Sequence, residues 1–405
     1  MGGLDPVYRA LWRRTRQIGS LVRFQPISPR RGIEIARRSR DVSRRVSRSV
    51  LAGGSARGSV PDNVGEMDGS ENDVLVIGSG VAGLTSAISL AEAGLRVTIR
   101  TAAPPEATTS AVAGAVWGPV NVRPAGRVRE WARIGLETLR SLESDPRAGI
   151  RSRSGRELSR VPEDPPEWAD LLDDLRLCSA DDLPPGFVSG WRYTAPVVSM
   201  PVYMAYLRAR FERAGGTIEV NPVTSLAEVT DRTAGAAPVV VNCPGAAARE
   251  LVPDPDVTAI RGQIVVIANP GIEEFYIDHS PDPPDVIYLF PHENTAVLGG
   301  TVAEGEWDTT PWPAVAMRVL RDCAAVDPRV LGADVLAHRV GLRPSRTEVR
   351  LEAEPLDGGR VLWHNYGHGG GGVTVSWGCA REITAAVLHG DGHSQGRAGA
   401  EKPVG

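Results

Sequence analysis

The sequence is poor in the residues that build metal and redox sites. Its four cysteines, Cys178, Cys243, Cys323 and Cys379, lie far apart, and none of them belongs to a CxxC pair. Its seven histidines include no HExxH pattern. Zinc sites and redox-active disulfides depend on such spacings, so we expect neither of them and predict no metal site.

Long hydrophobic runs are also missing. No stretch approaches the roughly 20 apolar residues that a transmembrane helix needs. The hydrophobic fraction of 42% and the charged fraction of 23% are typical of a globular protein. Because the cysteines are few and unpaired in sequence, we expect a cytoplasmic protein in a reducing compartment, without a membrane partner.

Lysine is almost absent: Lys402 is the only one, and arginine supplies the other basic side chains. Residues 1–50 carry thirteen arginines against three acidic residues, although the whole chain has a net charge of −4. Such a segment suits a transit peptide or a nucleic-acid-binding tail. A GC-rich coding bias explains it better, so we expect a start near Met67 and no nucleic-acid partner. Residues 1–70 are predicted to be a disordered basic extension, and 391–405 a disordered tail.

The ordered part is expected to begin with a β-α-β unit. Residues 73–78 form a short apolar run that ends in glycine, which is typical of a buried strand, and a helix over 79–94 and a strand over 96–100 follow. Further predicted strands lie at 238–242, 263–267, 287–290 and 295–298, the last two as an antiparallel hairpin, and further helices at 201–214 and 377–388. These patterns predict an α/β fold, with a Rossmann-like doubly wound sheet and a second, mostly antiparallel sheet.

The first chemical motif is a GxGxxG pattern between the first strand and the first helix. It consists of Gly78, Ser79, Gly80, Val81, Ala82 and Gly83. The first glycine permits a tight turn, the second lets the backbone approach a pyrophosphate, and the third lets the helix pack on the strand. The motif predicts a bound dinucleotide but does not separate NAD from FAD. The usual ribose-binding acid is replaced by Arg100 or Thr101, which leaves open NADP or a flavin with an altered adenosine pocket.

A second candidate segment follows the second strand. Thr108, Thr109 and Ser110 are three consecutive hydroxyl side chains, and the small-residue run 111–118 comes directly after them. Hydroxyls can donate to phosphates, and small residues let backbone lie against a flat ring. The simpler interpretation, that these residues cap a helix, stays open.

The third candidate segment is HNYGHGGGGVTVSWG, residues 364–378. Four consecutive glycines, 369–372, stand between polar rings and an apolar run. One interpretation is a flexible linker. The other is a backbone that passes close to a flat ligand and then turns into a helix, which the flanking aromatic and β-branched residues favour.

Taken together, these blocks resemble the FAD-dependent D-amino-acid oxidase/D-aspartate oxidase family over about residues 73–388. The resemblance rests on VIGSGVAGL, TTSAVAGAVWGP, VVNCPGA, RGQI, IYLFP, LGGT, GLRPSR and HNYGHGGGGVTVSWG, in that order. It implies non-covalent FAD and oxidation of a D-amino acid by hydride transfer from Cα to flavin N5. The products would be a 2-oxo acid and ammonia, with molecular oxygen as the second substrate and hydrogen peroxide released.

The resemblance also implies roles for single residues. Arg343 would hold the substrate carboxylate by two parallel hydrogen bonds, Tyr288 would add a third, and the Gly370 carbonyl would accept from the substrate amine. The ordinary alternatives are a surface salt bridge for Arg343 and a core position for Tyr288. The expected FAD-binding residues are Gly78, Ser79, Gly80, Val81, Ala82, Gly83, Thr108, Thr109, Ser110, Gly114, Ala115, Val116, Val223, Pro244, Arg343, Gly369, Gly372, Val373 and Thr374, while Gly118 would contribute backbone only.

Two histidines and two further cations need a separate interpretation. We expect His364 and His368 to be structural, because hydride transfer depends on geometry more than on a base. An acidic substrate would need a second cation, for which His279 and Arg346 are the candidates. Neither is decisive, so neutral or apolar D-amino acids are favoured. The connection 280–286 is shorter than the family's lid, rich in proline and without tyrosine, which predicts a more open or more rigid entrance.

The resemblance also divides the chain. The FAD-binding domain is expected over 73–122, 195–245 and 340–390, and the substrate-binding domain over 123–194 and 246–339. A homodimer is expected only by analogy with the family. The alternatives are a D-aspartate oxidase, a glycine-oxidase-like enzyme, a non-catalytic flavin-binding protein and an NADP-dependent reductase.

Overall fold

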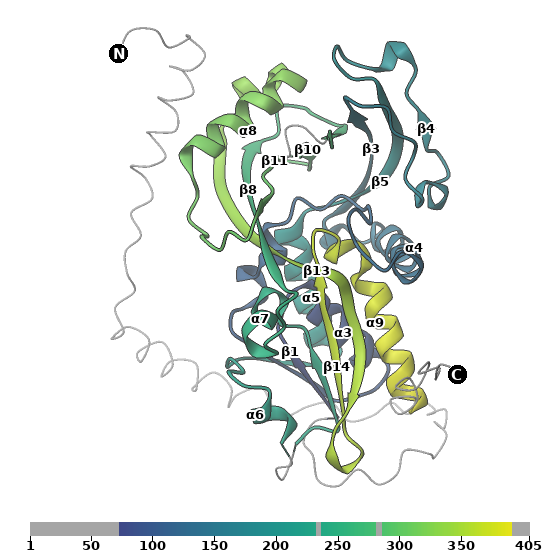
Figure 1. Ribbon diagram of the computed structural model, residues 1–405, viewed down its shortest axis with the longest axis vertical. Helices are drawn as coiled ribbons and strands as arrows, with labels where there is room; N and C mark the ends of the chain where they lie inside the picture. The colour runs from purple at the N-terminus through teal and green to yellow at the C-terminus, as the bar shows by residue number, and fades with distance from the viewer. Residues whose placement is uncertain (1–72, 232–235, 281–285, 391–405) are drawn as a thin grey trace, which may run out of the picture. The chain divides into compact units, whose positions relative to one another are not determined.

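The computed structural model describes residues 73–231, 236–280 and 286–390 (Figure 1). The predicted extension 1–70, the tail 391–405 and most of the predicted lid connection lie outside these residues. Within them, no helix is both long and apolar enough to cross a membrane.

The dinucleotide-type half is built on a parallel sheet. Its strand order is β14-β7-β1-β2-β6, and every neighbouring pair in it is parallel. Val74, Val76 and Ile77 of β1 are buried, as expected for a central strand covered on both faces. The predictions of β1, β2 and β7 are confirmed. The strand bounds are β1 Val74–Ile77, β2 Val97–Thr101, β6 Thr217–Val220, β7 Val239–Asn242 and β14 Val361–His368.

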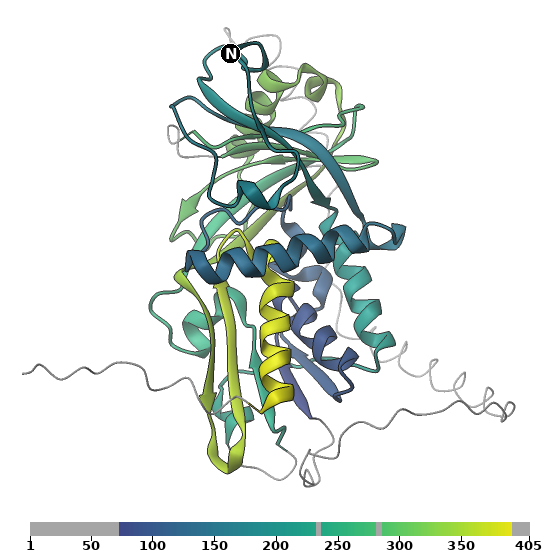
Figure 2. The ribbon, with the colours of Figure 1, turned by 90° about the vertical axis from the view of Figure 1, so that its right-hand side faces the viewer.

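Helices pack side by side against this sheet. The helix bounds are α3 Val81–Glu92, α4 Ala125–Leu142, α5 Met200–Arg213, α6 Ala227–Thr230, α7 Ala248–Leu251 and α9 Gly372–His389. Helix α3 contacts both α5 and α9, and α4 crosses α9 (Figure 2). Glycines permit that crossing: a Cβ at Gly378 would lie 2.2 Å from the Trp131 Cα, and one at Gly135 would lie 1.9 Å from the Thr374 carbonyl oxygen.

The second half is the predicted, mostly antiparallel sheet. Its order is β4-β5-β3-β9-β10-β11-β8, with β12 paired to β8, and β3–β9 is its one parallel pair among the described residues. The predicted hairpin of β10 and β11 is confirmed, with Leu289 opposite Leu298. The bounds are β3 Ile150–Ser159, β4 Arg176–Leu177, β5 Ser189–Val198, β8 Thr258–Ala268, β9 Phe275–Asp278, β10 Ile287–Pro291, β11 Thr295–Gly299, β12 Ala303–Glu304 and α8 Pro313–Val326.

One long strand joins the two halves. β13, Val335–Pro355, pairs with β8 through its first part and with β14 through its second. The register shifts between Ser345 and Arg350. Both halves therefore share one hydrogen-bonded path of strands. The predicted fold class is confirmed, whereas the predicted domain boundaries, one of which falls inside β13 at residue 340, stay predictions.

Candidate active site

The turn between β1 and α3 needs its glycines for steric reasons. Gly78 has a φ of 93°, and a Cβ there would lie 2.3 Å from the Cys243 carbonyl oxygen. A Cβ at Gly83 would lie 1.9 Å from the Gly78 carbonyl oxygen. Such contacts exclude a side chain at either position. The first and third glycines of the motif thus have the roles that the pattern predicts.

Of the three predicted phosphate-binding hydroxyls, Ser110 comes closest to the glycine loop. Its Oγ accepts a 3.0 Å hydrogen bond from the Val81 backbone N–H, at the first residue of α3. A Cβ at Gly80 would lie 3.3 Å from the same Oγ. Thr108 instead donates to the Pro105 carbonyl at 2.7 Å, which is a local turn contact. Thr109 lies beside Gly341, where an added Cβ would be 3.3 Å from the Thr109 methyl group.

Arg100 and Thr101, which stand in place of the missing ribose-binding acid, both form hydrogen bonds within the protein. Arg100 donates to the carbonyls of Asn221 and Pro222, at 3.4 and 3.3 Å. Buried Thr101 shares a 2.9 Å hydrogen bond with Ser79, whose hydroxyl also donates to the Ala103 carbonyl. Arg100 is therefore occupied by backbone carbonyls, and nothing about its position favours the NADP alternative.

The predicted adenosine-side residues lie in two different settings. Val223 packs beside the small buried cluster of Ile77, Val240 and their neighbours. Pro244 follows Cys243, and its Cα would lie 3.7 Å from a Cβ at Gly78, so it borders the glycine loop. Both residues thus lie at the same end of the parallel sheet as the GxGxxG turn.

The two expected carboxylate-binding side chains come together from different strands. Tyr288 lies on β10 and Arg343 on β13, and Arg343 Nη1 donates to the Thr301 carbonyl at 2.9 Å. Burial raises the pKa of Tyr288, and the neighbouring Arg343 guanidinium partly offsets that rise. A phenol and a guanidinium at one buried place can bind an anion such as a carboxylate.

Glycines surround this pair and leave room for it. A Cβ at Gly262 would lie 2.5 Å from Arg343 Nη2, and a Cβ at Gly299 would lie 2.0 Å from Tyr288 Cζ. Both glycines belong to sequence blocks of the family resemblance, RGQI and LGGT, in which no role was predicted for them. Isolated glycines inside predicted strands were the available signal, since they often mark a close approach by another group.

The small-residue segment and the final glycine run meet the same pair. A Cβ at Gly114 would lie 3.0 Å from the Tyr288 ring and 2.9 Å from Phe290, which stacks on Tyr288 with centroids 4.5 Å apart. A Cβ at Gly370 would lie 3.8 Å from Arg343 Cδ. The structure therefore places Gly114 beside Tyr288 and Gly370 beside Arg343, while their roles in binding stay predictions.

The glycine run is a turn, and the flexible-linker interpretation is wrong. Strand β14 ends at His368, Gly369 has a φ of 52° and donates to the Pro344 carbonyl at 2.7 Å, and α9 begins at Gly372. A Cβ at Gly371 would lie 2.3 Å from a Val122 methyl carbon. Helix α9 thus starts five residues earlier than the predicted Trp377, because the pattern gave no weight to glycine as a first helical residue.

Thr374 ties the start of α9 to the small-residue segment. Its Oγ1 donates to the Gly118 carbonyl at 3.1 Å and accepts from the Gly118 N–H at 3.2 Å. Gly118 thus contacts Thr374 through its backbone N–H and carbonyl, and its expected contact with FAD stays a prediction. Val373 is buried, and Ala115 has a positive φ of 50° next to half-buried Val116.

The two histidines of the final block lie in the core. His368 Nε2 hydrogen-bonds Asn365 Oδ1 at 3.0 Å, and burial lowers the His368 pKa to about 4. His364 Nδ1 lies 3.2 Å from Asn242 Nδ2, and burial lowers the His364 pKa. Both side chains are nearly inaccessible. Their contacts are those of structural residues.

Neither candidate for a second substrate-binding cation is free. His279 lies between Glu163, 2.5 Å from its Nε2, and Glu157, 3.4 Å from its Nδ1. Arg346 pairs with Asp254 at 3.0 Å and reaches Asp256 at 3.5 Å. An acidic substrate side chain would have to displace a carboxylate from either one.

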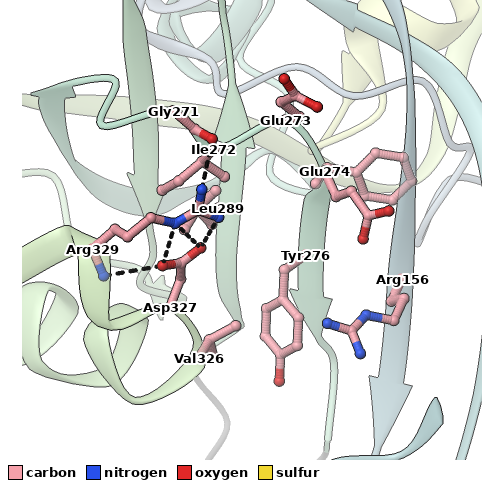
Figure 3. A pocket seen from close by; sticks show the side chains of 11 residues that line it. Arg156, Gly271, Ile272, Glu273, Glu274, Tyr276, Leu289, Val326, Asp327 and Arg329 are labelled. Atoms are coloured by element: carbon pink, nitrogen blue, oxygen red, sulfur yellow. Dashed lines mark hydrogen bonds and ion pairs between the residues drawn. The ribbon is translucent and has the colours of Figure 1, made fainter.

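A cavity of about 480 Å³ lies on the other face of the second sheet (Figure 3). Arg156, Tyr276 and Leu289 line it, and they are opposite one another on β3, β9 and β10. Side chains alternate between the faces of a strand, so Tyr288 points away from this cavity. It is therefore separate from the place where Tyr288 and Arg343 meet.

Comparison with known proteins decides the family. The sequence pattern of the family described as "FAD dependent oxidoreductase" matches residues 73–386.

This chain belongs to the FAD-dependent oxidoreductases.

Curated relatives of this oxidoreductase confirm the resemblance found in the sequence. The D-amino-acid oxidase of Rubrobacter xylanophilus is 50% identical over 77% of this chain and 94% of that protein. The D-amino-acid oxidase of Streptomyces coelicolor is 44% identical over 78% and 96% of the two chains. The D-aspartate oxidase of Homo sapiens is 31% identical over 78% and 94%.

Solved structures share the fold. Glycine oxidase from Geobacillus kaustophilus aligns with a TM-score of 0.65 at 19% identity, over 78% of this chain and 94% of that chain. L-proline dehydrogenase from P.horikoshii aligns with a TM-score of 0.65 at 15% identity, over 79% and 94%. At such identities the likeness concerns the fold alone, and it confirms the predicted fold class.

The residues present fit the FAD of this oxidoreductase family. The N-cap residues of α3 and α9, Gly80 and Gly371, supply no side-chain cap, and neither helix has an acidic residue in its first turn, although the Val81 N–H of α3 donates to Ser110 Oγ. Uncapped backbone N–H groups at a helix N-terminus favour an anion. The start of α3 suits the pyrophosphate, and the start of α9 suits the negative charge of a reduced flavin. The individual FAD contacts stay predictions.

Proposed function

We propose that this oxidoreductase is a D-amino-acid oxidase that acts on neutral D-amino acids. Its products are then a 2-oxo acid, ammonia and hydrogen peroxide, with molecular oxygen as the second substrate. The observation that carries the proposal is the pairing of Tyr288 with Arg343 at one buried place, beside the glycine backbone of Gly114 and Gly370. The identity of 50% with a D-amino-acid oxidase over 77% of the chain supports it.

Arg343 is proposed to bind the substrate carboxylate. Its Nη1 already donates to the Thr301 carbonyl, which fixes the plane of the guanidinium and leaves other N–H groups for a carboxylate. Tyr288 then adds one hydrogen bond from β10, which β11 and β8 separate from β13 in the sheet. Two fixed donors on one carboxylate orient the rest of the substrate, which is what the reaction requires.

Gly370 is proposed to meet the substrate amine with its carbonyl oxygen, because it borders Arg343 and no Cβ shields its backbone. FAD, when bound, supplies the acceptor for the hydride that leaves Cα. The amine must be neutral at that point, and solvent takes its proton. His368 does not serve as the base, because it is buried, bonded to Asn365 and has a pKa lowered to about 4.

Neutral substrates are proposed over acidic ones for an electrostatic reason. His279 and Arg346 both already face two carboxylates. A buried acidic side chain without a partner would be costly.

An anaerobic titration tests the function. The purified protein is loaded with FAD and mixed with D-alanine, D-valine, D-norleucine, D-aspartate and glycine, with the L-enantiomers as controls. We expect the oxidised-flavin absorbance to bleach with neutral D-amino acids only, and air to restore it with release of hydrogen peroxide. Bleaching by D-aspartate or glycine alone would move the assignment to a D-aspartate oxidase or a glycine oxidase. Bound flavin that no amino acid bleaches would support a non-catalytic flavin-binding protein.

Two further properties are proposed by analogy only. We propose a homodimer and a cytoplasmic location. Light scattering on the FAD-loaded protein measures the mass of the assembly, and a single-chain mass would contradict the dimer. Fractionation of the native cells would test the location.

A further inference from the structure

The direction of the Arg343 guanidinium depends on one backbone carbonyl. Arg343 Nη1 donates to the Thr301 carbonyl oxygen at 2.9 Å. The N–H groups of a guanidinium lie in one plane, so an acceptor fixed at one edge sets the direction of the others. Whatever fixes the Thr301 carbonyl therefore also fixes the donors that the proposed substrate carboxylate would meet.

Thr301 lies where the sheet carries one extra residue. Leu298 on β11 is opposite Val265 on β8. Ala303 on β12, five residues after Leu298, is opposite Arg261, which is only four residues from Val265. An extra residue on one side of a strand pair, as in a β-bulge, takes backbone groups out of the regular ladder and redirects them. Thr301 lies within this irregular interval.

The Thr301 hydroxyl replaces a backbone group of the ladder. Its Oγ1 accepts a 2.9 Å hydrogen bond from the Gln263 backbone N–H and donates to the Arg261 carbonyl at 3.4 Å. In a regular antiparallel pair, those two groups of β8 would bond to the backbone of the opposite strand. Because the hydroxyl meets both of them, the Thr301 carbonyl does not, and it accepts from Arg343 instead. The Thr301 side chain is 4% exposed, so water does not replace these contacts.

The same part of β8 is fixed from its opposite face. The Gln263 side chain donates to the Trp312 carbonyl at 2.9 Å and accepts from the Trp312 N–H at 2.8 Å. Arg261 is fully buried, lies 3.8 Å from the centroid of the Trp312 ring and donates to two backbone carbonyls just before that tryptophan. Side chains alternate along a strand, so Gly262 between them faces Arg343. The Gln263 N–H that meets Thr301 thus belongs to a well-fixed strand.

The segment 299–301 also borders the proposed second carboxylate donor. Gly299 is opposite Tyr288 in the pair of β10 and β11. A Cβ at Gly300 would lie 2.9 Å from Tyr288 Cε1. A shift of this segment would therefore change the surroundings of Tyr288 and Arg343 together.

We propose that Thr301 is a positioning residue for the substrate carboxylate: its hydroxyl joins β8 in place of a backbone group, so that its carbonyl sets the plane of the Arg343 guanidinium. The inference rests on the proposed D-amino-acid oxidase function and adds to it a residue that acts through Arg343. Without the hydroxyl, the buried Gln263 N–H loses its acceptor and the segment 299–301 shifts. The Arg343 donors then no longer match the carboxylate.

The test measures the binding of hexanoate, which has the carboxylate and carbon chain of D-norleucine without the amine. Its Kd is read from the flavin absorbance of the FAD-loaded protein, and the KM for D-norleucine is measured alongside. In Thr301→Val, which keeps the shape but not the hydroxyl, we expect both constants to rise at least about tenfold, while the Kd for FAD stays within about threefold. Thr301→Ser keeps a hydroxyl and should bring both constants back to within about threefold of the wild type.

A matched control removes a threonine hydroxyl elsewhere. Thr138 on α4 is half-buried, and its Oγ1 donates to the Ile134 carbonyl at 2.8 Å. Thr138→Val should leave the Kd for hexanoate unchanged. Arg343→Gln asks whether Thr301 acts through the guanidinium: in that background we expect Thr301→Val to change the D-norleucine KM by less than about threefold. A further tenfold rise there would mean that Thr301 acts independently of Arg343, and would overturn the inference.

The outcomes separate this inference from the proposed function. A hexanoate Kd in Thr301→Val within about threefold of the wild type overturns the inference, and so does an equal loss of FAD affinity, which would indicate a general loss of structure. Should Thr301→Val fail to fold, Thr301→Cys takes its place, because a thiol is a weak acceptor; a Kd equal to that of Thr301→Ser then overturns the inference. If no D-amino acid bleaches the wild-type flavin, the proposed function itself fails.

Discussion

Gly299→Ala tests whether the position of Tyr288 controls catalysis. The new Cβ would stand 2.0 Å from Tyr288 Cζ and 2.4 to 2.5 Å from both Cε atoms. An ordinary carbon contact is about 3.5 to 4 Å, so the ring must move by more than about 1 Å. Phe290 stacks on the ring, and Gly114 closes another side, so the ring cannot shift freely. A displacement of this size at a positioning group costs on the order of 100-fold in rate.

The assay is kcat/KM with D-norleucine, normalised to bound flavin, together with a thermal melt. We expect kcat/KM to fall on the order of 100-fold, and overpacking to lower stability by about 1 to 3 kcal/mol. Gly332→Ala is the matched control, because a Cβ there meets nothing within 4 Å and its φ is not positive. A Gly299→Ala protein with kcat/KM within threefold of the wild type would refute the role given to Tyr288.

Three more predictions follow from single contacts. Arg343→Gln removes charge-assisted hydrogen bonds worth about 1.5 to 3 kcal/mol each, so kcat/KM for D-norleucine should fall by about 100-fold or more; a loss under tenfold in steady-state assays would contradict carboxylate binding. In Gly83→Val the added Cβ would already lie 1.9 Å from the Gly78 carbonyl oxygen, so the glycine loop must shift. We therefore expect the purified protein to lose its flavin absorbance, and a full flavin content would contradict this packing. His368 has a folded-state pKa lowered to about 4, against about 6.5 unfolded, so the unfolded state binds more protons and stability should decline as the pH falls from about 6.5 to 4. Chemical denaturation at several pH values should show a smaller decline in His368→Asn, although buried His292, whose pKa is also lowered to about 4, will contribute the rest; an unchanged slope would contradict the prediction.

The glycine loop shows which parts of the fold a local sequence pattern can predict. Gly78, Gly80 and Gly83 lie within six consecutive residues, so the strand, the turn and the helix around them follow from neighbouring residues alone. The hairpin of β10 and β11 was predicted for the same reason. By contrast, β3 and β5 were missed. Their arginines and serines interrupt the apolar alternation, although Trp191, Tyr193 and Leu158 are buried.

The carboxylate-binding pair shows a different limit. Tyr288 and Arg343 were identified through resemblance to a family, because their own neighbours in sequence do not distinguish a binding site from a core tyrosine and a surface arginine. Their meeting depends on β10, β11, β8 and β13 being paired in one register. Gly262 and Gly299 received no role for the same reason: the rings that need their space come from other strands.

The sequence by itself determined the dinucleotide-binding unit, the fold class and the likeness to D-amino-acid oxidases, because each depends on residues close together or on blocks kept in order. The tertiary structure alone decided which side chains share a face. Glu157 is 131 residues from Tyr288 in sequence, yet β9 is the only strand between theirs in the sheet. Long-range strand register sets that proximity, and no local pattern of residues encodes it.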